Sequence, residues 1–165
     1  MAARCMNDRP HLFLTGEKGV GKSTLLRILL GSRKAGGFYT VRCRGKNGYA
    51  LYLLAGEELP GEENFLCSCP PAENEGTARR FDRLGCAALK RSGEVLVMDE
   101  IGPAERQAKA FCEAVLQALD GDIPILGVLQ KGDYPLFAAI EAHPNVRLVE
   151  VTKENRNRLA AELRR

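Results

Sequence analysis

Tryptophan is absent from this chain of 165 residues, histidine occurs only twice, and aromatic residues make up 6% of the sequence. Long apolar runs are also absent, since none approaches the roughly 20 residues that a membrane-spanning helix needs. The first residues, MAARCMND, lack the apolar core of a secretion signal. These absences argue against a membrane partner and predict a cytoplasmic protein.

A strong excess of one charge is missing too. The chain has 24 lysines and arginines against 21 aspartates and glutamates, and the basic residues are dispersed. Nucleic-acid binding is indicated by clustered positive charge, so the sequence offers no argument for a nucleic-acid partner. The length suits one domain over residues 1–165, and a hydrophobic fraction of 45% allows a real core.

Metal-ligating residues do not gather in the pattern of a zinc site. Six cysteines are present, and free thiols are the default where no secretion signal is found. Cys67 and Cys69 form a C-x-C pair, but His11 and His143 do not cluster with it in the sequence. We therefore expect structural thiols at this pair rather than zinc ligands.

Glycine, in contrast, is concentrated in one short stretch, FLTGEKGVGKSTLL at residues 13–26. This stretch fits the phosphate-binding pattern G-x-x-x-x-G-K-[ST] through Gly16, Gly21, Lys22 and Ser23. The apolar residues before it predict a short buried strand at 11–14, and those after it predict a helix that ends near Gly31. Strand, glycine-rich loop and helix are the context that a phosphate loop requires.

The chemistry of such a loop explains its composition. Glycines let the backbone curl so that successive N–H groups point at one place, and the helix N-terminus adds partial positive charge there. We expect Lys22 to be exposed in the empty loop and to reach the β- and γ-phosphates, and Ser23 to ligate Mg²⁺. Lys18 lies outside the pattern, and a solvated charge is the favoured interpretation for it.

The rest of the chain alternates between strand and helix patterns. Gly36 and Gly37 are expected to break the chain before a hairpin, and residues 55–77, rich in proline, glycine and glutamate, predict a long irregular, lid-like excursion. The expected strands are 38–41, 49–54, 95–98, 123–129 and 146–151, and the expected helices are 79–90, 104–119, 135–142 and 156–165, the last capped by Thr152. This alternation predicts an α/β fold with a mostly parallel central sheet, flanked by helices on both faces, plus an antiparallel hairpin.

Two adjacent carboxylates follow the most apolar strand pattern, Val-Leu-Val-Met at 95–98. In a nucleotide-binding sheet this strand ends beside the phosphate loop. Asp99 would then hold Mg²⁺, and Glu100 would act as a general base or orient the attacking water.

With these segments in view, the chain resembles the cancer-related nucleoside-triphosphatase family, small P-loop NTPases of THEP type. The resemblance covers nearly the whole chain. It is carried by the loop at 16–23, Gly-Phe-Tyr-Thr at 37–40, Met-Asp-Glu-Ile-Gly at 98–102, residues 127–132 and Val-Thr-Lys-Glu-Asn-Arg at 151–156.

The resemblance implies a RecA-like fold and Mg²⁺-dependent hydrolysis of nucleoside triphosphates, ATP and GTP among them, to the diphosphate and phosphate, with loose base selectivity. It implies that Asp99 and Glu100 have the roles argued above. It also implies phosphate contacts along the whole loop, from Gly16, Glu17, Lys18, Gly19, Val20, Gly21, Lys22, Ser23 and Thr24.

Several assignments stay open at this point. Asn155 and Arg156 follow a strand end, where they would either flank a base or form a helix cap with a solvated arginine; Lys131 is similarly placed. Arg44 and Arg79 are candidates for charge stabilisation, although a surface position is favoured for each.

Two other functions use the same loop. A nucleotide or small-molecule kinase would need an acceptor pocket, and residues 55–77 would be its lid. A nucleotide-gated binding module would hydrolyse slowly to reset a partner interface. Glu100 directly after Asp99 favours hydrolysis, because activation of water is a hydrolase's need.

Overall fold

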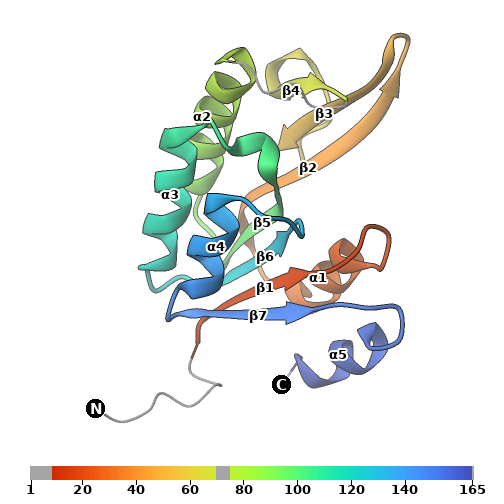
Figure 1. The fold of residues 1–165 in the computed structure, drawn as a ribbon, viewed down its shortest axis with the longest axis vertical. Coiled ribbons are helices and arrows are strands. Elements are labelled where there is room, and N and C mark those ends of the chain that lie inside the picture. The colour runs from red at the N-terminus through yellow and green to blue at the C-terminus, as the bar shows by residue number, and fades with distance from the viewer. Residues whose placement is uncertain (1–8, 70–74, 165) are drawn as a thin grey trace.

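One seven-stranded sheet organises the molecule, and the computed structural model describes residues 9–69 and 75–164. The strand order is β4-β3-β2-β5-β6-β1-β7 (Figure 1). Neighbours from β2 through β7 in this order pair in parallel, whereas β3 and β4 are antiparallel additions at one edge. The strands are β1 (His11–Thr15), β2 (Ala35–Gly45), β3 (Gly48–Leu54), β4 (Phe65–Ser68), β5 (Val95–Ile101), β6 (Ile125–Leu129) and β7 (Val146–Glu150).

Helices cover both faces of the sheet (Figure 1). They are α1 (Lys22–Leu30), α2 (Glu75–Leu89), α3 (Lys109–Leu119), α4 (Pro135–Ala142) and α5 (Arg156–Glu162), with 3₁₀ turns η2 (Glu62–Asn64) and η3 (Pro103–Glu105). None of the helices in the described part of the chain has the length and apolar character to cross a membrane.

Successive residues of the central strands feed two separate hydrophobic cores. On β1, Phe13 packs with the core under α2, α3 and α4, and its neighbour Leu14 packs with the core under α1 and α5. On β5, Met98 and Val97 divide in the same way. Side chains alternate between the faces of a strand, so an unbroken apolar run is what a strand buried on both sides requires. The predicted α/β fold with a mostly parallel sheet is confirmed.

The expected break at Gly36 and Gly37 is wrong, because β2 already begins at Ala35. Gly37 has a φ of 85°, and a Cβ there would collide with the carbonyl oxygen of Val97 on β5. The two glycines therefore permit a close strand–strand approach rather than a turn. The predicted antiparallel hairpin is confirmed, with β2 and β3 paired from Tyr39 and Leu54 outward.

The expected irregular excursion at 55–77 is partly wrong. It contains η2, the edge strand β4 and the first turn of α2, which starts at Glu75 rather than at residue 79. Leu66 and Cys67 on β4 are buried in the core under α2. An apolar segment of three residues among charges and prolines is too short to reveal a strand through its periodicity. Residues 70–74 of the excursion lie outside the described residues.

Two further boundaries differ from the expectation. β5 continues past Met98 to Ile101, and the helix expected from residue 104 is divided into η3 and α3, which begins only at Lys109. The Glu105 carboxylate oxygen Oε2 accepts the Gly102 N–H at 2.9 Å, which closes the short turn before α3 can start. In the turn before α5, Thr152 Oγ1 accepts the Asn155 N–H at 3.2 Å. The N-cap residue of α5 is Asn155, without a side-chain capping hydrogen bond, so the expected cap by Thr152 acts on the preceding turn.

Candidate active site

The phosphate loop lies between the end of β1 at Thr15 and the start of α1 at Lys22. Its glycines take backbone conformations that L side chains rarely adopt, with φ of 142° at Gly16, 79° at Gly19 and 99° at Gly21. A Cβ on Gly16 would also collide with the carbonyl oxygen of Val151. The glycines are therefore required by the loop's curvature and by its contact with the segment after β7.

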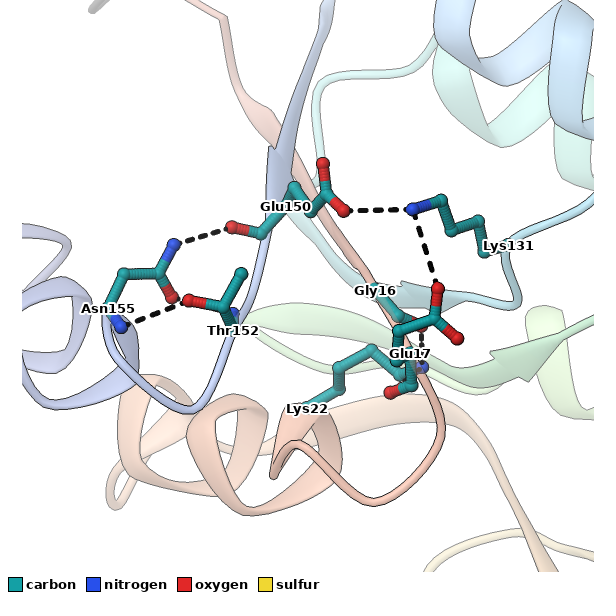
Figure 2. Close-up of polar contacts among 7 residues, drawn as sticks. All are labelled: Gly16, Glu17, Lys22, Lys131, Glu150, Thr152 and Asn155. Atoms are coloured by element: carbon teal, nitrogen blue, oxygen red, sulfur yellow. Dashed lines mark hydrogen bonds and ion pairs between the residues drawn. The ribbon is translucent and has the colours of Figure 1, made fainter.

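Lys22 is buried, contrary to the expectation that it would be exposed. Its side chain is 8% exposed, and Nζ donates to the Gly16 carbonyl oxygen at 2.6 Å and to that of Glu17 at 3.3 Å (Figure 2). A buried ammonium needs acceptors, and the loop's own carbonyls supply them. The lysine is thus already folded over the loop and needs little movement to meet a phosphate.

Ser23 and Asp99 meet across the site although 76 positions separate them in sequence. Ser23 Oγ, on α1, donates to Asp99 Oδ1, on β5, at 3.0 Å. Burial raises the pKa of Asp99, while the Ser23 hydrogen bond and the charges of Arg27 and Lys22 counteract the shift. Hydroxyl and carboxylate oxygens are the ligands that Mg²⁺ prefers, and the chemistry of this pair fits that ion.

Glu100 is half-buried and lines the cleft in front of the phosphate loop. Its backbone N–H donates to Thr40 Oγ1 on β2 at 3.1 Å, which fixes the chain where the register between β5 and β6 shifts. Burial raises the pKa of its carboxyl, and the charge of Lys22 opposes that shift. A carboxylate with a raised pKa binds a proton more readily, as a general base must.

The cleft itself has a volume of about 730 Å³ and extends from the phosphate loop to the β2–β3 hairpin. Sequence reasoning identified seven of its lining residues as site residues: Gly16, Glu17, Lys18, Lys22, Ser23, Asp99 and Glu100. The assignment of Lys131 stays open in the sequence, and eight further lining residues receive no site role there: Thr40, Arg42, Leu51, Cys69, Gly102, Pro103, Glu105 and Gln130. Thr40 and Arg42 could have been found from their period-two spacing behind Gly-Phe-Tyr, since alternate residues of a strand share a face.

Asn155 and Arg156 do not line this cleft. Asn155 Oδ1 accepts the Thr152 N–H at 2.7 Å and Nδ2 donates to the Glu150 carbonyl oxygen at 2.9 Å, so its side chain closes the turn before α5 (Figure 2). Arg156 Nη1 donates to the Val20 carbonyl oxygen at 3.4 Å. Asn155 therefore closes a turn and Arg156 supports the loop, and a role beside the base stays a prediction for both.

The other predicted loop residues and arginines fall in several places. Val20 is buried in the core under α1, and Gly19, Gly21 and Thr24 are outside the cleft lining. Arg79 pairs with Glu75 at 2.6 Å on the surface of α2.

Lys131 joins the phosphate loop to the end of β7 (Figure 2). Its Nζ lies 3.0 Å from Glu150 Oε1 and 3.7 Å from Glu17 Oε1. All three side chains are at least half exposed, so the pairs add little to stability. Their effect is to hold a cation at the rim of the loop, next to the cleft.

A strand–glycine loop–helix unit that places a buried lysine and a hydroxyl–carboxylate pair at the edge of a parallel sheet defines a P-loop nucleotide-binding protein. More specifically, the family model described as NTPase matches residues 11–164, and the chain belongs to this NTPase family.

Named relatives agree with this family. The chain is 33% identical over 180 residues to the cancer-related nucleoside-triphosphatase of Homo sapiens, covering 93% of this chain and 94% of the relative. It is 31% identical over 171 residues to the nucleoside-triphosphatase THEP1 of Thermofilum pendens, covering 94% and 93%. The crystal structure of THEP1 from Aquifex aeolicus superposes with a TM-score of 0.73 at 26% identity, over 93% of this chain and 96% of that one.

Proposed function

We propose that this protein catalyses the Mg²⁺-dependent hydrolysis of nucleoside triphosphates, ATP and GTP among them, to the nucleoside diphosphate and phosphate. The observation that carries the proposal is the contact of Ser23 with Asp99 beside the phosphate loop, with Glu100 next to it on the open cleft. Hydroxyl, carboxylate and a second carboxylate are the groups that metal binding and water activation need. The names of the relatives support the substrate class.

Binding of the triphosphate falls to the loop and Lys22. The left-handed glycines turn loop N–H groups toward one place, and the N-terminus of α1 adds positive potential there. Lys22 exchanges its carbonyl acceptors, Gly16 and Glu17, for phosphate oxygens. Because charged acceptors make stronger hydrogen bonds than neutral ones, this exchange favours the bound state.

Ser23 and Asp99 are the residues that would hold Mg²⁺, which when bound neutralises charge on the β- and γ-phosphates. Their hydrogen bond already brings both oxygens to one place, so little reorganisation is needed. Asp99 is 5% exposed, so few water molecules can reach its carboxylate and compete with the ion for it.

Glu100 acts on the nucleophile. The oxygen of a water molecule forms a bond to the γ-phosphorus, the bond from that phosphorus to the β–γ bridging oxygen breaks, and the Glu100 carboxylate takes the water's proton. The hydrogen bond from the Glu100 backbone N–H to Thr40 fixes the chain at this point, and the raised pKa of the carboxyl suits a base.

A kinase is the second candidate, because the cleft continues past the phosphate loop to Arg42, Leu51 and Cys69 on the hairpin side. An acceptor molecule would have room there. The position of Glu100 on the cleft favours water as the acceptor.

The test is phosphate release from ATP, GTP, CTP and UTP in buffer alone, with Mg²⁺ or with a chelator, and with no acceptor present. We expect release from each triphosphate with Mg²⁺ and none with the chelator, and none from a Lys22→Ala variant prepared in parallel. Phosphate transfer that requires an added acceptor, with no release to water, would contradict hydrolysis and favour the kinase.

A further inference from the structure

Glu105 is a buried carboxyl that the proposed reaction does not use. It is 3% exposed, lies in η3 behind β5, and lines the same cleft as Glu100. Its Oε2 accepts the Gly102 N–H at 2.9 Å, which is a capping contact within the turn. A glutamine could make that contact equally well, so capping alone does not explain an acid at this position.

The surroundings of Glu105 contain acids and thiols. Glu105 interacts electrostatically with Glu100 on β5, with Cys67 on β4 and with Tyr134, the residue before α4. Cys112 on α3 donates its Sγ–H to the Glu105 carbonyl oxygen at 3.5 Å. When ionised, each of these four side chains carries a negative charge, which repels a carboxylate.

The charged groups of α2, which packs against η3, are directed elsewhere. Arg80 Nε donates to the Leu66 carbonyl oxygen on β4, and Asp82 Oδ1 accepts the Phe111 N–H on α3. Within residues 9–69 and 75–164, no lysine, arginine or histidine forms an ion pair with Glu105.

A carboxylate taken out of water without a cation is strongly disfavoured, and the group keeps its proton instead. The pKa of Glu105 is accordingly raised to about 8, chiefly by burial. The backbone N–H groups of Gly102 and Glu105 oppose the shift, and the charge of Glu100 adds to it.

We propose that Glu105 is a positioning residue that works as an uncharged acid: it leaves Glu100 as the charged carboxylate at its end of the cleft, and its own ionisation turns the site off. The inference rests on the proposed hydrolysis. A second negative charge on the cleft lining, beside Glu100, would repel the triphosphate. Glu105 is not placed on a reacting atom, so its effect passes through the charge of the cleft that it lines with Glu100.

The first experiment compares the pH dependence of kcat/KM for GTP hydrolysis in the parent and in Glu105→Gln, which stays neutral and retains the oxygen that caps η3. The matched control is Glu141→Gln on the exposed side of α4. At pH 6.5 we expect all three proteins to agree within about twofold. At pH 9 a group with a pKa of about 8 is roughly nine-tenths ionised, so the parent and Glu141→Gln should fall about tenfold below Glu105→Gln.

The second experiment needs no substrate, so it separates failure of this inference from failure of the proposed hydrolysis. The folded pKa of Glu105 is raised above its unfolded value, so the folded state holds a proton that the unfolded state has lost between pH 4.5 and about 8. Urea unfolding should therefore show the parent losing stability relative to Glu105→Gln as the pH rises through this window. Glu141→Gln should follow the parent.

Two results would overturn the inference. The first is a Glu105→Gln variant that falls at pH 9 as steeply as the parent. The second is a folded Glu105→Gln variant that is inactive at pH 6.5. An absence of phosphate release by the parent at every pH would contradict the hydrolysis instead, and the urea measurement would still decide whether Glu105 carries a proton.

Discussion

The two sides of the cleft hold their polar side chains in different ways. On the phosphate-loop side, Lys22 is buried with two acceptors and Ser23 is bonded to Asp99. On the hairpin side, Arg42 is exposed, and its guanidinium carbon lies 4.4 Å from the centre of the Tyr49 ring. The phosphate-loop side is preorganised for its ligand. On the hairpin side, the charge of Arg42 would have to move to reach one.

Because of this difference, the two sides should contribute unequally to the reaction rate. Groups that are already fixed stabilise a transition state without reorganisation during the reaction, so the phosphate-loop side should supply most of the rate. A charge on a solvated side chain contributes less, because it loses conformational freedom when it becomes ordered. Substitutions on the loop side should therefore have the larger effects.

The largest effect is expected from Lys22→Ala. Removal of the ammonium leaves the phosphates without their charged donor and frees the loop carbonyls that it holds, so turnover should fall by about 10³-fold or more. Steady-state phosphate release measures this, with circular dichroism to verify folding. The control is Lys90→Ala, at an exposed position just after the end of α2. Turnover like that of the parent would show that the loop does not bind the phosphates.

Arg42→Ala tests the hairpin side. An arginine fixed on the transition state is worth roughly 10³–10⁵ in rate, whereas an exposed one resting on a tyrosine ring should cost only about tenfold. Single-turnover phosphate release distinguishes these two losses in rate. The control is Arg83→Ala, at an exposed position of α2. A loss of 10³-fold would mean that the hairpin side moves in and completes the catalytic site, which would break the comparison.

A smaller effect is expected from Lys131→Ala. The lysine bridges Glu17 and Glu150 through half-exposed ion pairs, which solvent and salt weaken. We expect KM for the triphosphate to rise about threefold, with kcat unchanged and the effect weaker in high salt. Nucleotide titration at two ionic strengths measures it, and a fall in kcat without a change in KM would place Lys131 in the reaction.

The smallest effect on activity is expected from substitution of Cys67 or Cys69. Cys69→Ser should change neither activity nor stability, since the thiol is half-exposed on the cleft. Cys67 is 4% exposed in the core, so Cys67→Ser should lower the free energy of unfolding by about 1–3 kcal/mol while activity is kept. Urea unfolding and zinc analysis measure both points; stoichiometric zinc that is lost in either variant would contradict our reading of these thiols.

The same division separates what the sequence reveals from what it conceals. A spaced motif predicts the phosphate loop and α1, and an unbroken apolar run predicts β5; both are local signals in the sequence. β4 does not, because its contribution of Leu66 and Cys67 to the core depends on pairing with β3. Edge strands of this kind are decided by tertiary contacts rather than by propensity.

The burial of individual charged residues was equally hard to foresee. The sequence predicts an exposed Lys22, because the motif specifies the residue type but not the backbone carbonyls to which Nζ donates. Glu105 lies within a stretch that reads as the start of a helix, and only the turn at Gly102 folds its carboxyl into the cleft. The periodicity of a sequence shows which face of an element is apolar. It does not show that a local turn, closed by a backbone N–H, buries the carboxyl of Glu105.

The most direct test of the account compares Asp99→Asn with Glu100→Gln by nucleotide titration beside single-turnover phosphate release. We predict that Glu100→Gln binds Mg²⁺–GTP with nearly the parent's affinity but releases phosphate about 10²–10⁴-fold more slowly, which corresponds to about 3–5 kcal/mol of transition-state stabilisation. Asp99→Asn should lose affinity and release together. Unchanged release by Glu100→Gln, or a loss of affinity equal to that of Asp99→Asn, would contradict the assignment of metal to one carboxylate and water to the other.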